Sequence, residues 1–243
     1  HLISPHIPKF ISYPGWHFMR PAEWIDSVKR LPQNRILMSS ELIAWTAPNK
    51  IRSFCKELKT HFDLKICFYL RRQDNIIMAG YNQQVKAGTQ IRKLITALDK
   101  MITRFDYVKL ISPWEECVGV ENIIIRPYEK KQFYRGDLVR DFLWFVLDID
   151  NVNNFSFESS ENPNPRFSRE TLEFKRRINN IFSEIAESSE FNAALIAYSM
   201  KYYKKSNEIF HDQGTLTYKQ RQYILSKFAA DNEYIAKKYF FGL

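Results

Sequence analysis

The stretch from Leu64 to Lys86 limits what this chain can fold into more than any other. A short apolar run, Ile66 to Leu70, stops at Arg71 and Arg72, and apolar residues at helical spacing begin beyond Asp74. A short run of aromatic and branched residues bounded by charge is typical of a strand buried on both faces. An acidic residue before a 3.6-residue pattern is typical of a capped helix. The stretch therefore predicts a strand, a turn and a helix capped by Asp74.

The arginine pair lies where this strand would end and the helix would begin. Free N–H groups at a helix N-terminus and guanidinium groups both attract anions. Ligands of open α/β sheets bind at the carboxyl ends of the strands. The pattern therefore indicates a pocket for an anionic group at Arg71 and Arg72. The alternative, that both arginines are solvated residues ending a strand, is equally open.

Composition narrows the class of protein without choosing a partner. The chain has 243 residues and a net charge of +9, which suits one main domain and favours anionic partners: nucleotides, nucleic acid, acidic glycans or a membrane surface. Its three cysteines show no Cys-x-x-Cys spacing, which argues against a disulfide framework or a zinc site and fits a reducing cytosol. No apolar run reaches the length of a membrane span and no secretory signal is visible. We expect a cytoplasmic protein with at most peripheral membrane contact.

Strand and helix patterns alternate along the first two thirds of the chain. After an irregular N-terminal segment and helix (1–34), further strands are predicted at 35–38 and 123–128, and helices at 49–61, 90–104, 113–118 and 138–147. Only helices follow the loop at 148–165: 169–186 capped by Ser168, 191–204, 218–229 capped by Thr217, and 232–241. Thr89 would cap the helix at 90–104, whose inward face would comprise Ile91, Leu94, Ile95, Leu98 and Ile102. The expected fold class is α/β in a single domain, 1–243, with a mostly parallel sheet flanked by helices and a helical C-terminal part (166–243).

Several familiar catalytic patterns are missing from the sequence. The five histidines show neither i,i+4 pairing nor carboxylates at ligand spacing, so no metal is expected. There is no Gly-x-Ser-x-Gly for a serine hydrolase and no Gly-x-Gly-x-x-Gly for a dinucleotide. A basic nucleic-acid binder is the weakest hypothesis for the function, because no recognised aromatic-basic motif accompanies the positive charge.

Six short segments together resemble a known family. They are Ile36 to Glu41, Tyr69 to Gln83, Trp114 with Gly119, Asn122 to Glu129, Gly136 to Leu143 and Phe228 to Ala236. In order and spacing they resemble the bacterial sulfotransferase-like proteins found with polysaccharide-biosynthesis enzymes, relatives of the carbohydrate sulfotransferases. The resemblance covers roughly 35–243.

That resemblance implies a P-loop-like α/β fold that binds 3′-phosphoadenosine-5′-phosphosulfate. It implies transfer of the sulfuryl group to a sugar hydroxyl of a capsule, lipopolysaccharide or other cell-surface polysaccharide, with a nucleotide donor and a carbohydrate acceptor as partners and no nucleic acid. In the family an arginine that ends a central strand and a serine eight residues later hold the 3′-phosphate. Arg71 matches the arginine, whereas Ala79 stands in the serine's place.

A second departure concerns the family's 5′-phosphosulfate loop, which carries lysine and glycine and should precede Ser39-Ser40-Glu41. We do not find it, and His6 to Lys9 lacks the small residues whose N–H groups would wrap a phosphate. An alternative function is therefore a catalytically degenerate protein that keeps the fold as a glycan-binding or scaffolding component.

Sulfuryl transfer needs a base for the acceptor hydroxyl and cations around the leaving phosphate. On the resemblance, Glu41 is the candidate base and Arg72 a second cofactor ligand, while Arg126, Tyr81 and Trp114 would contact substrate. Plainer structural roles are open for each. Glu41 would suit the first turn of a helix, Tyr81 and Trp114 would suit the core, and Arg72 would suit the solvent.

Overall fold

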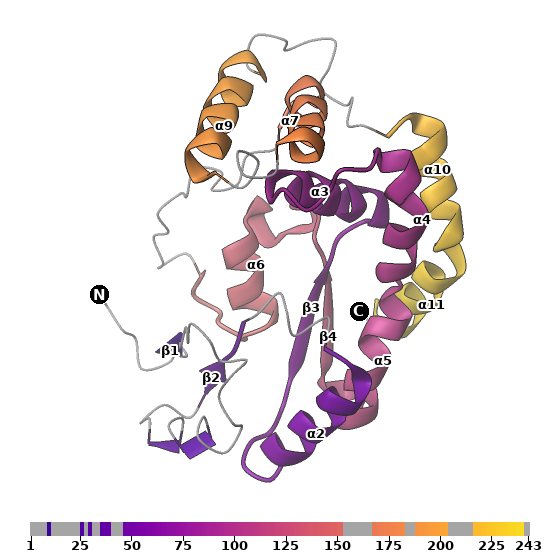
Figure 1. The fold of residues 1–243 in the computed structure, drawn as a ribbon. Helices are drawn as coiled ribbons and strands as arrows, with labels where there is room; N and C mark the ends of the chain where they lie inside the picture. The colour runs from indigo at the N-terminus through magenta and orange to yellow at the C-terminus, as the bar shows by residue number, and fades with distance from the viewer. Residues whose placement is uncertain are drawn as a thin grey trace. The chain divides into compact units, whose positions relative to one another are not determined.

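The computed structural model describes residues 9–10, 25–26, 29–30, 35–39, 46–152, 167–182, 188–203 and 216–240 (Figure 1). They form mixed α/β structure that is mostly helical, with a small parallel sheet, so the prediction of a mixed α/β protein is confirmed. The chain divides into two compact units. The first comprises His1–Phe68 and Val108–Ile125, and the second comprises Tyr69–Tyr107 and Arg126–Leu243.

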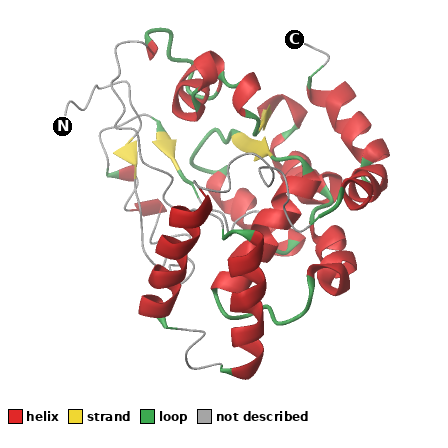
Figure 2. Ribbon diagram, turned by 90° about the horizontal axis from the view of Figure 1, so that it is seen from above, coloured by secondary structure: helices red, strands yellow, loops and turns green. Residues whose placement is uncertain are grey.

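The described strands are short and pair two by two, as Figure 2 shows in yellow among the helices. β1 (Lys9–Phe10) runs parallel to β2 (Ile36–Leu37), and β3 (Ile66–Leu70) is the hydrogen-bonded neighbour of β4 (Ile123–Pro127). β3 has the predicted bounds, but its five residues are only half-buried rather than covered on both faces. The N–H of Tyr128 donates to the carbonyl of Leu70 at 2.7 Å. The residues that follow β3 and β4 therefore lie at the same edge of the sheet.

In the first unit, α2 (Pro48–Leu58) packs an apolar face onto strand residues. Leu58 and Ile25 are buried there with partly buried Ile36, Met38, Phe54, Phe62 and Leu64. Polar contacts join α2 to the residues that precede β4. Arg52 binds Glu116 at 2.7 Å, and Lys59 donates to the carbonyl of Cys117 at 2.8 Å.

Glu116 and Cys117 belong to α5 (Tyr107–Val118), which differs from its prediction. We expected a short helix starting at Pro113, but the helix begins six residues earlier and Pro113 lies inside it. Proline removes one intrahelical hydrogen bond. Burial of Ile111, Trp114 and Val118 at helical spacing stabilises the longer helix and offsets that loss. Gly119 then ends it with φ of 86°, and the 3-10 turn η3 (Val120–Asn122) leads into β4.

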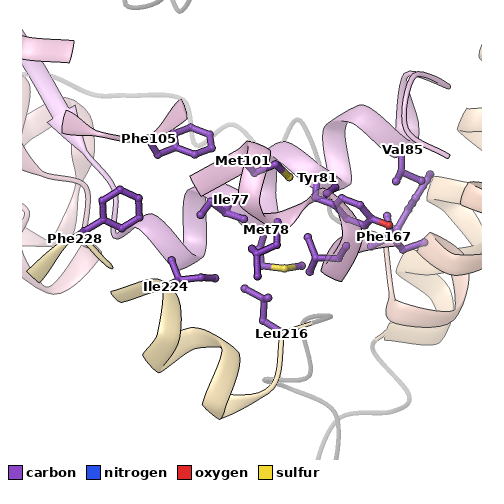
Figure 3. Packing of buried hydrophobic residues seen from close by; sticks show 14 residues of the cluster. Ile77, Met78, Tyr81, Val85, Met101, Phe105, Phe167, Leu216, Ile224 and Phe228 are labelled. Carbon is purple, nitrogen blue, oxygen red and sulfur yellow. The ribbon is translucent and has the colours of Figure 1, made fainter. Parts of the chain in front are cut away.

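The second unit is organised around α3 (Gln73–Lys86), against which α4 (Leu94–Arg104), α7 (Arg169–Ile181) and α10 (Tyr218–Lys227) pack (Figure 1). The remaining elements of this unit are η4 (Lys130–Gln132), η5 (Tyr134–Gly136), α6 (Leu138–Phe145), α9 (Ser189–Tyr203) and α11 (Ala229–Tyr239). Figure 3 shows the core, in which Ile77, Met78, Tyr81 and Val85 of α3 lie among residues of the neighbouring helices, including Met101, Phe105, Leu216, Ile224 and Phe228.

Helix starts were predicted with mixed success. Ser168 caps α7 and Thr217 caps α10, both as expected; Thr217 forms a capping box with Gln220. The helix predicted at 90–104 ends at Arg104 as expected, but its predicted start at Gln90 and its cap at Thr89 were wrong, because α4 begins at Leu94 and no side chain caps it among the described residues. The N–H groups of Thr89 and Gln90 instead donate to the carbonyl of Gln84. This segment closes α3 and is therefore not available to start a helix.

The shift of α4 also changes its buried face. Leu94, Ala97, Leu98 and Met101 face the core, whereas Ile91 and Ile95, both predicted to face inward, are exposed. Across the described part of the chain, no helix is both long and apolar enough to cross a membrane.

Candidate functional site

The candidate site lies where β3 ends and α3 begins, within the second unit. Arg71 and Arg72 form the turn, and α3 starts at Gln73 with Arg72 as its N-cap residue. No side-chain hydrogen bond caps this helix among the described residues. Asp74 was predicted to be the cap, and this was wrong: it lies one position inside the first turn. The positive end of the α3 dipole therefore faces the turn without a capping side chain over it.

Arg71 is half-buried and its position is fixed from two sides. Its guanidinium carbon lies 5.6 Å from the ring centroid of Tyr128, the first residue after β4, which is 41 % exposed. A cation over an aromatic face at this distance is attracted to it. The Arg71 carbonyl accepts a hydrogen bond from the hydroxyl of Tyr107. Burial raises the pKa of Tyr107, so this hydroxyl stays protonated and keeps donating.

Asp74 is fully buried and shared by two arginines. Arg72 donates to it through Nε at 2.7 Å and Nη2 at 3.0 Å, and Arg221 of α10 donates through Nη1 at 2.6 Å. Burial opposes ionisation of Asp74, but the hydrogen bonds from Arg72 and Arg221 outweigh it and lower the pKa of the carboxyl below its usual value. One carboxylate cannot balance two guanidinium groups. Asp74 and its two arginines together therefore carry a net positive charge.

The C-terminal helices hold this end of α3 in place. Arg221 also donates to Asn75 at 3.3 Å, and the side-chain amides of Gln73 and Asn232 exchange hydrogen bonds of 2.6 and 3.1 Å. Sequence reasoning missed Arg221 and Asn232. Nothing in their local sequence distinguishes them from other polar helix residues, because both meet α3 across more than 140 residues of chain.

Arg126 ends β4 at the same edge, but its guanidinium is occupied. It donates to Asp141 of α6 through Nη2 at 2.6 Å and Nε at 3.0 Å, and lies 3.6 Å over the ring of Phe145. Asp141 is fully buried and also accepts hydrogen bonds from the Tyr69 hydroxyl and the Tyr134 N–H, each at 2.8 Å. The structure therefore places Arg126 in a balanced internal ion pair that ties β4 to α6, whereas we had predicted a source of positive charge for substrate.

The other predicted site residues are Tyr81, Trp114, Ala79 and Glu41. Tyr81 is 3 % exposed, and its hydroxyl donates to the carbonyl of Arg92 at 2.8 Å, as expected of a core residue. Trp114 is buried in the first unit. Ala79 is half-buried in the second turn of α3. Glu41 lies outside the described residues, so its predicted role as base stays a prediction.

The buried carboxylates of Asp74 and Asp141 should make the stability of the protein depend on pH. The pKa of Asp141 is lowered because the hydrogen bonds from Arg126, the Tyr134 N–H and Tyr69 outweigh burial, and the pKa of Asp74 is lowered as described above. A carboxyl whose folded pKa is depressed stabilises the fold above its unfolded pKa and loses this contribution as pH falls through the folded pKa. We expect the free energy of unfolding, measured by urea titration, to hold between pH 7 and 5 and to fall progressively below about pH 4.

The substitution Asp141→Asn provides the control for that pH series. The variant should be less stable at pH 7 and should lose less stability between pH 5 and 3, because one of the two depressed carboxyls is gone. If the free energy of unfolding depends on pH equally in the variant and the wild type, Asp141 is not one of the carboxyls that cause the dependence.

In the described residues, no three His, Cys, Asp or Glu side chains are grouped so that they could hold a metal ion.

Comparison with known proteins finds a distant relative. An uncharacterized protein of Archaeoglobus fulgidus is 28 % identical over 207 residues, which are 84 % of this chain and 54 % of that protein. The chain thus spans about half the length of the relative it matches. No protein-family model matches the chain, and no solved structure matches it.

Proposed function

We propose that this protein is a carbohydrate sulfotransferase with a P-loop-like arrangement of its α/β elements. It would bind 3′-phosphoadenosine-5′-phosphosulfate and transfer the sulfuryl group to a hydroxyl of a polysaccharide sugar. The observation that carries the proposal is Arg71, held at the carboxyl end of β3 where α3 begins without a side-chain cap. A guanidinium and the N-terminal end of a helix dipole suit the 3′-phosphate of this nucleotide.

The surroundings of Arg71 support an anion there. The group of Asp74, Arg72 and Arg221 carries a net positive charge, and the Arg72 side chain of this group is 56 % exposed. The ring of Tyr128 lies beside the Arg71 guanidinium and is accessible to a ligand. We leave Arg126 and Tyr81 out of the proposed contacts because their polar groups are bound within the protein.

In the proposed reaction, an acceptor hydroxyl oxygen attacks the sulfur in line with the bond from sulfur to the bridging phosphate oxygen. The new O–S bond forms as that bond breaks, and adenosine 3′,5′-bisphosphate leaves with the electron pair. A general base takes the hydroxyl proton, the role predicted for Glu41. Positioning and charge stabilisation supply most of the acceleration in such displacements.

A glycan-binding protein without activity is the second candidate, and Ala79 favours it. The methyl group of Ala79 stands in the serine's place and removes one hydroxyl donor from the proposed phosphate site. A lost hydrogen bond weakens binding by about 1 kcal/mol, and somewhat more when the acceptor is charged, as a phosphate is. This weakens binding of the nucleotide without abolishing it. The polypeptide therefore either transfers the sulfuryl group with weaker donor affinity or binds the polysaccharide alone.

A transfer assay separates these functions. The protein is incubated with radiolabelled sulfuryl donor and a panel of capsular and lipopolysaccharide acceptors, and incorporation into polymer is counted. Incorporation that stops when Arg71 is replaced supports the sulfotransferase. Acceptor binding without nucleotide binding or transfer supports the second candidate. Strong, salt-dependent retention of oligonucleotides in place of either would overturn both and indicate a nucleic-acid binder.

A further inference from the structure

The contact between Arg221 and Asp74 joins the C-terminal part of the chain to the start of α3. The side chain of Arg221 is 18 % exposed, and its Nη1 lies 2.6 Å from Oδ2 of Asp74, whose side chain has no exposed surface. The same oxygen also accepts from Nη2 of Arg72 at 3.0 Å. Asp74 thus links a partly buried arginine on α10 to a largely exposed arginine beside the candidate anion site.

We propose that Arg221 is a positioning residue of the candidate anion site, an inference that rests on the proposed function. Arg221 holds the Asp74 carboxylate, and the carboxylate holds the Arg72 guanidinium beside the first turn of α3. Because Asp74 is divided between two cations, the group of three carries a net charge of about +1. Without Arg221, Asp74 would be left to Arg72 alone, and the charge of Arg72 would be balanced.

The simpler possibility is that Arg221 only anchors α10 to α3. A neighbouring contact provides a matched control for that possibility. Gln73 and Asn232 join α11 to the same turn of α3 through neutral amides. Replacing Asn232 with alanine removes an anchor at this turn without altering any charge.

The two roles predict opposite effects at Asp74. If Arg221 acts by charge and position, Arg221→Met weakens the affinity for adenosine 3′,5′-bisphosphate roughly tenfold, since one positive charge near the phosphate is lost. Asp74→Asn keeps an oxygen that can accept from Arg72 Nε and removes the negative charge, so it should tighten binding several-fold while lowering stability. The double variant, Arg221→Met with Asp74→Asn, has the same net charge as the wild type and should bind the nucleotide with nearly the wild-type affinity. If Arg221 is only an anchor, the three variants lose stability as Asn232→Ala does, and their affinities stay unchanged or fall together.

The experiment measures two quantities for each variant of the whole chain. Isothermal calorimetry with adenosine 3′,5′-bisphosphate gives the affinity, and urea titration gives the free energy of unfolding. Asn232→Ala should lose stability and keep its affinity. Arg221→Lys, which keeps the charge, should retain most of the affinity and stands in if Arg221→Met does not fold.

The outcomes separate this inference from the proposed function. Weaker binding for Arg221→Met and tighter binding for Asp74→Asn support the positioning role. Unchanged affinity in both variants, or equal weakening in both, overturns that role and leaves the proposed function standing. Failure of the folded wild-type protein to bind the nucleotide overturns the proposed function, and the positioning role with it.

Discussion

Replacing Arg126 with methionine should destabilise the protein by about 3–5 kcal/mol, because it leaves the buried Asp141 carboxylate without its cation. Asp141 has no exposed surface, and Arg126 supplies two of the hydrogen bonds that it accepts. The Tyr69 hydroxyl and the Tyr134 N–H remain, but neither carries a charge. Urea titration at pH 7 measures the loss.

A double substitution tests the cause of that loss. Arg126→Met combined with Asp141→Asn removes the stranded charge, so the double variant should be more stable than Arg126→Met alone. Arg52→Met serves as the comparison, since its ion pair with Glu116 is more than half exposed on both sides and should contribute at most about 1 kcal/mol. A loss below about 1 kcal/mol for Arg126→Met would contradict the assigned ion pair.

Local pattern predicted the elements around the candidate site well. The apolar run of β3 and the helical spacing of α3 depend on neighbouring residues, and both elements lie where the sequence indicated. The caps at Ser168 and Thr217 are also local, because each side chain meets an N–H group three residues away. Such features need no knowledge of the tertiary fold.

The partners of the charged residues could not be predicted in this way. Asp74 suited a helix cap by position, but it accepts hydrogen bonds from Arg221, which is 147 residues away in the chain. Arg126 suited an anion site at a strand end, but Asp141 on the following helix binds it. Leaving a buried carboxylate without a cation costs more free energy than leaving a helix terminus without a cap. Pairing with a distant arginine therefore overrides the local preference of the residue.

Arg71 is the arginine on which the proposed phosphate contact depends. Arg71 lies on the accessible ring of Tyr128, next to the uncapped start of α3. Arg71→Met should therefore weaken binding of adenosine 3′,5′-bisphosphate at least roughly thirtyfold, the cost of removing a charged partner from a phosphate. Loss of the contact with Tyr128 should cost stability only about 0.5–1 kcal/mol.

The calorimetric titration of adenosine 3′,5′-bisphosphate into wild type, Arg71→Met and the control Arg169→Met tests the central claim most directly. Arg169 is an exposed arginine at the first position of α7, so its replacement makes the same change of net charge elsewhere in the second unit. We predict that wild type and Arg169→Met bind with similar affinity and that binding by Arg71→Met is at least roughly thirtyfold weaker. Equal binding by all three proteins, or none by the wild type, would contradict the claim that the turn between β3 and α3 holds the phosphate of a nucleotide.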